Sequence, residues 1–236
     1  MSDSPSTSAA SAGAHLGERE REGVVDLLGA IAYGTMSGFT RMAADSELTD
    51  DLRLKTAVAG MAVGEFHSHE LLVGHIRALG ADPVAAMSPF VEAFDSFHVR
   101  TAPRNLAEAL VKAYIGDGIA DDFFREISVF VDDESRAIIA AASADDGRTD
   151  VIVEEVRAQI RADRHLAGSL ALWGRRLMGE ALSQGQLVAA HREALVELIL
   201  GQSHSRRGAD LGEMGAIMQR LTDAHQQRMA RLGLSA

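Results

Sequence analysis

Residues 49–83, TDDLRLKTAVAGMAVGEFHSHELLVGHIRALGADP, carry the pattern that decides the fold class. Apolar side chains recur through this stretch at three- and four-residue spacing, which is the period of one helix face. Thr49-Asp50-Asp51 suits a helix start, and Gly80-Ala81-Asp82-Pro83 suits a helix stop. The face comprises Val58, Ala62, Glu65, His69, Leu72, Ile76 and Leu79. The stretch therefore predicts one long helix with a carboxyl and an imidazole group on its apolar face.

The same spacing extends over nearly the whole chain, and alternating runs typical of strands are absent. Further helices are expected at about 20–44, 103–130, 149–163, 165–201 and 209–232, with short helical segments at 83–98 and from 132. The first turn is tight, whereas the route from the second long helix to the third is long. That contrast favours two antiparallel helix pairs joined by a crossover, with a plain up-and-down bundle as the alternative. We expect one all-α domain, with 19–163 as the bundle and 164–236 as helices packed on it.

Composition and charge exclude several classes of protein. The chain has 236 residues and no cysteine, so disulfides, zinc–thiolate sites and cysteine nucleophiles are excluded. No apolar run reaches the length of a membrane span, and residues 1–18 resemble a disordered arm rather than a secretory signal. We therefore expect a cytoplasmic protein that does not enter a membrane.

The charge distribution bears on the partners. A formal charge of −11 argues against broad contact with nucleic acid. Residues 157–236, however, hold 11 Lys/Arg against 7 Asp/Glu, a local excess of 4 positive charges. A local surface for an anion such as tRNA therefore stays open, beside the alternative that these charges line a solvated helix face.

Acidic residues and one histidine on the predicted core faces are candidates for a metal site. A two-iron bundle uses a Glu from each of two helices and a Glu-x-x-His from each of two others. Glu65 lies on the core face, but Ser68 stands three residues later and His69 four. Asp117 and Asp121 share one face of the helix expected at 103–130.

The remaining positions of such a site are not filled. Thr35 stands where the first helix would present its acid, and the segment 149–163 has no Glu-x-x-His. The pattern favours a hydrogen-bonded Glu65–His69 pair that binds no metal. The alternative is a residual metal site of Glu65, His69, Asp117 and Asp121. We assign no catalytic residue and expect no cofactor, with iron as the metal if the residual site is functional.

Trp173, Arg175 and Arg176 form a second candidate site. An indole and two guanidinium groups can stack on a ligand and pair with an anion. The alternative is that Trp173 is an anchor of the core or of an interface.

Several short motifs resemble a known family. They are Tyr33-Gly34, Glu65-Phe66, Glu70-Leu71-Leu72, Gly80-Ala81-Asp82-Pro83, Tyr114-Ile115-Gly116-Asp117-Gly118, Phe123, Leu172-Trp173-Gly174-Arg175-Arg176 and Leu232-Gly233-Leu234. Over about residues 20–234 the chain resembles ferritin-like hydroxylases, and more narrowly the actinobacterial relatives of tRNA 2-methylthio-N6-isopentenyladenosine hydroxylase. The resemblance implies a ferritin-like four-helix bundle and, in active members, a non-haem two-iron centre that hydroxylates an isopentenyl group with oxygen. Glu65 matches the first residue of the family's Glu-x-x-His, whereas Ser68 and Thr35 depart from the pattern.

Two functions are compatible with these features, and a third, iron storage or detoxification, would need a ferroxidase site and a cage. The first is a non-catalytic ferritin-like protein that binds a small molecule or a protein partner and forms a homodimer. The second is a two-iron hydroxylase acting on a modified tRNA base. The missing ligands favour the first, and the basic C-terminal third keeps the second open.

Overall fold

The computed structural model describes residues 17–143, 149–201 and 208–236, and these are helical with no strand among them. The predicted disordered arm falls almost entirely on residues 1–16, outside this described part. The helices are α1 (Glu18–Asp45), η1 (Ser46–Leu48), α2 (Leu52–Ala78), α3 (Pro83–Met87), η2 (Ser88–Phe90), α4 (Val91–Arg100), α5 (Leu106–Ile127), η3 (Ser128–Phe130), α6 (Asp133–Ala142), α7 (Thr149–Ala162), α8 (His165–His191), α9 (Glu193–Leu200) and α10 (Leu211–Leu232). The prediction of an all-α bundle is confirmed.

Local capping explains where several of these helices begin. The side chain of Asp51 accepts a hydrogen bond from the Leu54 amide at 3.0 Å and so caps α2, as predicted. Asn105 caps α5 by accepting from the Glu108 amide at 3.0 Å, so that helix begins at Leu106, about three residues later than expected. Gly80 follows α2 with φ of 74°, a backbone conformation that glycine adopts without strain.

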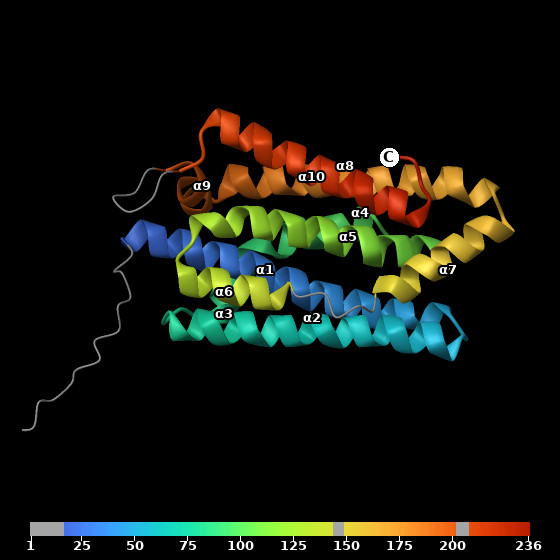
Figure 1. Ribbon diagram of the computed structural model, residues 1–236. Coiled ribbons are helices and arrows are strands. Elements are labelled where there is room, and N and C mark those ends of the chain that lie inside the picture. The colour runs from blue at the N-terminus through green and yellow to red at the C-terminus, as the bar shows by residue number, and fades with distance from the viewer. Residues whose placement is uncertain (1–16, 144–148, 202–207) are drawn as a thin grey trace, which may run out of the picture.

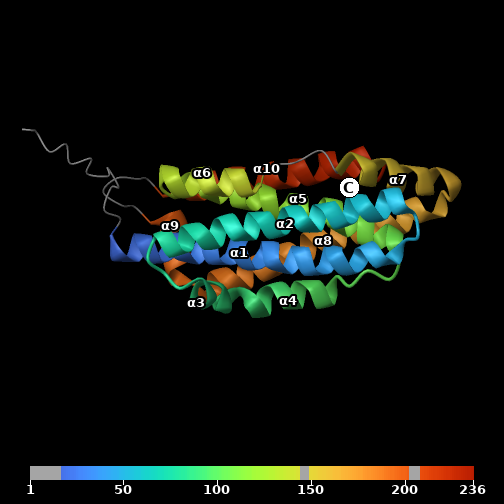
Figure 2. The same cartoon turned by 90° about the horizontal axis from the view of Figure 1, so that it is seen from below.

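The core of the molecule is a bundle of α1, α2, α5 and the α6–α7 pair. α1 and α2 are antiparallel neighbours, and α3 and α4 run back along the bundle before α5 begins (Figure 1). α5 runs in the direction of α2, and α6 followed by α7 runs back along the opposite direction. The second view shows α6 and α7 one after the other along the same side of the bundle (Figure 2). This is the crossover connectivity that the loop lengths predicted.

The last helices pack on this bundle. α8 lies along α4 and α5, α9 lies against α1, and α10 contacts α5 and α7. The prediction of one helix over 165–201 is wrong, because the chain breaks at Arg192. Arg192 forms an ion pair with buried Asp26 of α1, with Nε 2.9 Å from Oδ2. The break turns α9 onto α1, where the absent side chain of Gly23 admits the Ala194 carbonyl oxygen; a Cβ on Gly23 would lie 2.5 Å from it.

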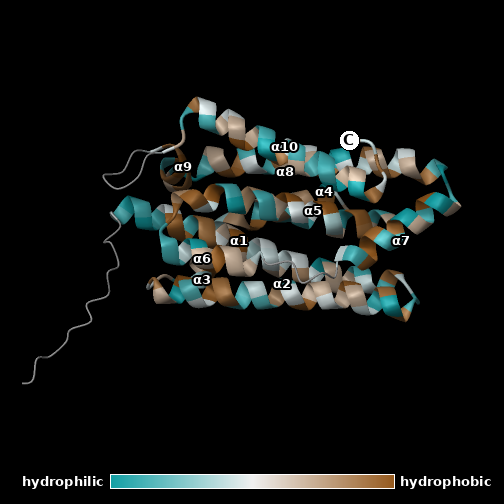
Figure 3. Cartoon of the chain, viewed as in Figure 1, coloured by the Kyte–Doolittle hydropathy of each residue, from teal (hydrophilic) through white to brown (hydrophobic). Residues whose placement is uncertain are grey.

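The hydrophobic core is divided into two clusters along the bundle. One cluster contains Met61, Ile115, Ile152, Leu177 and Leu232, and the other contains Leu28, Leu72, Phe90, Ile139 and Leu198. Apolar and polar residues alternate along the helices, as amphipathic packing requires (Figure 3). The residues between the two clusters are about 33–38 of α1 and 65–69 of α2; on α5 the clusters adjoin, with Ile119 in the first and Ala120 packed against the second, flanked by Asp117 and Asp121. We call this level of the bundle the gap.

Within the described residues, no helix has the length and apolar character needed to cross a membrane.

Candidate functional site

Three carboxyl groups meet in the gap. Glu65 projects from α2, and Asp117 and Asp121 project from α5; together they form the acidic cluster. The Glu65 and Asp117 side chains are hydrogen-bonded, and Asp121 lies within electrostatic reach of both. All three are only partly buried. The structure therefore brings together three of the four residues predicted for a metal site.

Burial changes the protonation of the acidic cluster. Burial raises the pKa of Glu65 to about 7, its hydrogen bond with Asp117 opposes the rise, and the charge of Asp121 adds to it. Burial, followed by the charge of Asp117, raises the pKa of Asp121 to about 7, against the effect of a hydrogen bond with Ser143. An ionised carboxylate only accepts hydrogen bonds, so the Glu65–Asp117 contact requires a proton on one partner. The cluster therefore shares protons near neutral pH.

α1 contributes room to the site but no acid. A Cβ on Gly38 would lie 3.2 Å from Oε2 of Glu65, so the bare glycine leaves space for that carboxyl group. The Thr35 hydroxyl donates to the Ala32 carbonyl oxygen of its own helix at 3.0 Å. Phe39 of α1 lies against Phe66 of α2, with ring centroids 5.1 Å apart, and gives the gap an aromatic edge.

His69, the fourth predicted ligand, bonds to α1. Its ring is buried, stacks on Phe66 with centroids 5.9 Å apart, and has Nδ1 2.8 Å from the Ala32 carbonyl oxygen. A carbonyl oxygen can only accept, so Nδ1 carries the proton and donates it. The hydrogen bond that the structure shows for His69 thus goes to α1, and the predicted Glu65–His69 hydrogen bond is not among the contacts of the described residues.

The donor set does not fit a two-iron centre. The Ser68 hydroxyl, at the position where a Glu-x-x-His has its histidine, donates to the Ala142 carbonyl oxygen at 2.6 Å. Ala142 is the last residue of α6, so the fourth helix is interrupted opposite the acidic cluster. On α7, Glu154 pairs with Arg53 at 3.0 Å and Asp150 pairs with Arg231, both at the surface. Among the described residues, no three His, Asp or Glu side chains are arranged to hold a metal ion.

The second predicted site, Trp173 with its arginines, is occupied by contacts within the chain. Trp173 is buried, and its indole Nε1 donates to the Glu108 carbonyl oxygen at 2.9 Å. Arg176 lies over the Trp173 ring, 6.0 Å from the centroid, and Arg175 donates to the Ser235 carbonyl oxygen at 2.9 Å. These contacts give the three residues a role in holding α5, α8 and the C-terminal residues together. Their predicted role in ligand binding stays a prediction.

A second polar group of residues, which the sequence patterns did not indicate, lies toward one end of the bundle. Arg41 and Asp45 of α1, His98 of α4 and Lys112 of α5 interact electrostatically; we call them the basic cluster. Burial lowers the pKa of Lys112 to about 8 and that of His98 to about 3. The Lys112 ammonium donates to the Thr101 carbonyl oxygen at 2.8 Å. The signal in the sequence was a lysine inside the apolar run of residues 106–115.

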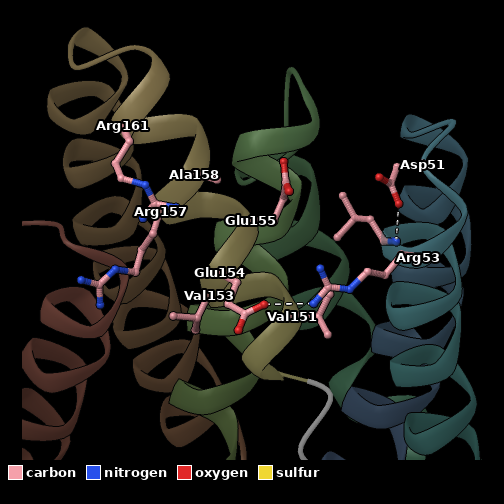
Figure 4. Close-up of a pocket in the computed structure, with 10 residues that line it drawn as sticks. Asp51, Arg53, Val151, Val153, Glu154, Glu155, Arg157, Ala158 and Arg161 are labelled. Atoms are coloured by element: carbon pink, nitrogen blue, oxygen red, sulfur yellow. Dashed lines mark hydrogen bonds and ion pairs between the residues drawn. The ribbon is translucent and has the colours of Figure 1, made fainter.

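A surface cleft of about 670 Å³ lies between the start of α2 and α7. It is lined by Asp51, Arg53, Leu54, Val151, Val153, Glu154, Glu155, Arg157, Ala158 and Arg161. Arg53 and Glu154 meet across it (Figure 4), but both side chains are about 70% exposed and such a pair stabilises little. The cleft contains none of the predicted site residues.

Comparison with known proteins agrees with this architecture. Curated proteins give no match to the chain. A family model described as "Ferritin-like domain, actinomycetes" matches residues 18–202, which span the bundle, α8 and α9. The chain belongs to this family of actinomycete ferritin-like domains.

Proposed function

We propose that this protein is a non-catalytic ferritin-like bundle that binds a small molecule in the gap between its two hydrophobic clusters. The observation that carries the proposal is the division of the core at the level of the acidic cluster, whose members are partly exposed there. Removing carboxyl groups from water is unfavourable. Apolar side chains at these positions would therefore give a more stable bundle. A polar, partly exposed level of the bundle is better suited to binding a ligand than to stability.

The surroundings of the gap indicate the chemistry of the ligand. The acidic cluster offers hydrogen-bond donors and acceptors, because its carboxyl groups share protons. Phe39 and Phe66 add apolar surface beside Glu65, and the Glu65 carboxyl group lies against Gly38. A few polar groups in an otherwise apolar site are typical of small-molecule binding. The ligand is therefore a small molecule with an apolar body and one hydrogen-bonding group.

Side chains that would complete a catalytic centre are used for the packing of the bundle. Thr35 and His69 both bond to the Ala32 carbonyl oxygen, and Ser68 bonds to the end of α6. These contacts support a binding role for the acidic cluster rather than a role in redox chemistry.

The test uses three probes of one size: n-butylamine, n-butanol and butyrate. We expect at least one to raise the unfolding midpoint in a concentration-dependent way, and the rise to vanish in Gly38→Leu, whose side chain would displace the Glu65 carboxyl group. Gly74→Leu, on the exposed face of α2 where a Cβ would meet nothing within 4 Å, is the matched control and keeps the response. No shift with any probe, or a shift that persists in Gly38→Leu, contradicts the proposal.

The second candidate is a non-haem two-iron hydroxylase acting on a modified tRNA base. The convergence of Glu65, Asp117 and Asp121 inside the bundle is the observation in its favour. Elemental mass spectrometry of protein produced with iron, without a chelator or a histidine tag, separates the two functions. About two irons per chain, lost in Glu65→Ala and accompanied by oxygen consumption, would replace the binding proposal with this one.

Light scattering coupled to gel filtration addresses the expected homodimer, and it also separates these functions from iron storage, which requires a large cage. A protein partner in place of a small ligand stays the alternative if the probes fail while the metal content is negligible.

A further inference from the structure

α10 docks on the bundle through one apolar stripe with a histidine at its centre. The buried residues of this stripe are Ile217, Leu221, His225, Met229 and Leu232. Two glycines allow the close approach. A Cβ on Gly174 of α8 would lie 2.4 Å from Sδ of Met229, and one on Gly118 of α5 would lie 2.1 Å from Nε of Arg228. α10 is therefore seated in a groove shaped for it.

His225 is the position where this docking is weakest. Its side chain is 5% exposed, and neither ring nitrogen has a hydrogen-bond partner among the described residues. An apolar side chain at the same place in the stripe would avoid the unfavourable burial of two polar nitrogens. Burial, and then the charge of Arg228, lowers the pKa of His225 below its ordinary value.

Charged groups near His225 are already paired. From α5, Asp122 binds Arg228 at 2.7 Å and Arg125 at 3.0 Å, and Glu126 binds Arg220 at 2.6 Å. A proton on His225 would therefore add a positive charge next to Arg228 in a buried place.

The other two helices packed on α10 offer no better partner. On α7, Asp150 pairs with Arg231, and Arg157 donates to the Arg231 carbonyl oxygen. On α8, Glu180 faces Arg100 of α4, and Arg175 holds the Ser235 carbonyl oxygen. On α5, Asp121 also interacts electrostatically with Arg228, but burial raises its pKa to about 7, so it keeps a proton at lower pH. On α10 itself, Asp223 accepts a hydrogen bond from Gln219 at 2.8 Å. Within the described residues, the carboxyl groups named around His225 are thus paired or protonated.

We propose that α10 is a pH-dependent latch, which is docked on α5 and α8 while His225 is neutral and released as His225 takes up a proton. The inference does not rest on the proposed ligand site, although Arg228 also interacts electrostatically with Asp121 of the acidic cluster. Its consequence is exposure of the α5 face around Gly118 and Asp122, because Arg228 leaves with the helix.

The direction follows from linkage. The docked state disfavours protonation of His225. The free energy that holds α10 in place is therefore largest above the ordinary histidine pKa of about 6.5, and it decreases as the pH falls below that value. Each pH unit in that window raises the undocked fraction up to about tenfold, until the pKa of docked His225 is reached.

Hydrogen exchange with mass spectrometry at pH 7.5 and 5.5, corrected for the intrinsic rate, tests the latch. We expect exchange in residues 211–232 to rise up to about tenfold at pH 5.5, while peptides of α2 change much less. In His225→Leu the rise should disappear. The exposed His191, on the neighbouring α8, gives the control His191→Leu, which should behave as the wild type.

Equal protection of α10 at the two pH values would overturn the proposal, and so would a rise that survives in His225→Leu. If His225→Leu does not fold, His225→Met places a flexible, unbranched apolar chain in the stripe and is read in the same way. A rise shared equally by α2 peptides would indicate global unfolding and would also overturn the latch.

Discussion

The acidic cluster, on α2 and α5, and the basic cluster, on α1, α4 and α5, share one helix, yet burial changes their protonation in opposite directions. Burial is the first cause of the raised pKa of Glu65 and Asp121 and of the lowered pKa of His98 and Lys112. In each case the interior disfavours the charged form, so buried acids keep protons and buried bases lose them. One physical effect thus gives the two regions opposite responses to pH.

The surroundings of the two clusters also differ. In the basic cluster, the Lys112 ammonium donates a hydrogen bond to the Thr101 carbonyl oxygen and is attracted by the carboxylate of Asp45. These contacts join the end of α1, the end of α4 and α5. The acidic cluster has acids from two helices and shares protons instead of pairing with a base. Bases and an acid meet in the basic cluster, whereas acids alone form the acidic cluster, at the level where the two hydrophobic clusters meet. This contrast is why we place ligand binding in the gap and a structural role at the end.

The largest expected effect is on the acidic cluster. The pKa of Glu65 is raised, so its contribution to stability is full below about 4.5 and is lost as the pH rises through about 7. Glu65→Gln is neutral at every pH. We compare the free energy of unfolding of Glu65→Gln with that of the wild type. This difference should be about 2–3 kcal/mol more favourable to the variant at pH 8 than at pH 4, because a tenfold change in proton affinity corresponds to about 1.4 kcal/mol.

Urea unfolding at the two pH values measures this difference. Exposed Glu154 gives the control Glu154→Gln, for which we expect a change near zero. A Glu65→Gln advantage independent of pH would show that the gap leaves Glu65 fully solvated, and the contrast between the clusters would fail.

The opposite slope is expected for the basic cluster. His98 has a pKa lowered to about 3, so its contribution is full above the ordinary value of about 6.5 and is lost as the pH falls toward 3. Between pH 7.5 and 5 the free energy of unfolding of the wild type should fall by about 2 kcal/mol because His98 takes up a proton. That of His98→Leu should not show this fall. Urea unfolding at both pH values measures the loss, with exposed His67→Gln as the control that keeps it. An equal loss in His98→Leu would mean that His98 is not desolvated.

The local sequence pattern was sufficient to predict the helices, but not the break between α8 and α9. The three- and four-residue spacing and the Asp51 cap predicted the bundle helices to within a few residues. The break at Arg192 could not be predicted, because it depends on Asp26, which lies 166 residues away in the chain. Helical periodicity continues across such a break, so tertiary pairing alone reveals it.

The sequence predicted which site residues share a helix face, but not which contacts they make with other helices. Spacing placed Asp117 and Asp121 on one face and Glu65 on another, and these three do meet. Spacing also placed His69 beside Glu65, but the Ala32 carbonyl oxygen of another helix binds its ring. His98 and Lys112 were missed because their partners come from three helices, although a lysine within an apolar run was the available clue.

The smallest expected effect compares glycines inside and outside the gap. A Cβ on Gly74, on α2, would meet nothing within 4 Å, so Gly74→Ala should gain about 0.5–1 kcal/mol of helix stability. Gly38→Ala brings the same helical gain, but its Cβ would lie 3.2 Å from Oε2 of Glu65, so the net gain should be smaller.

Thermal or urea unfolding of Gly38→Ala, Glu65→Ala and the double variant separates the two contributions. If Glu65 fills the space beside Gly38, removing its carboxyl group should restore the full gain of Gly38→Ala, so the two substitutions are not additive. The pair Gly74→Ala and Glu65→Ala should be additive, because no contact joins those positions. Additivity in both cycles would mean that Glu65 does not rest against α1, and the gap would then be open on that side.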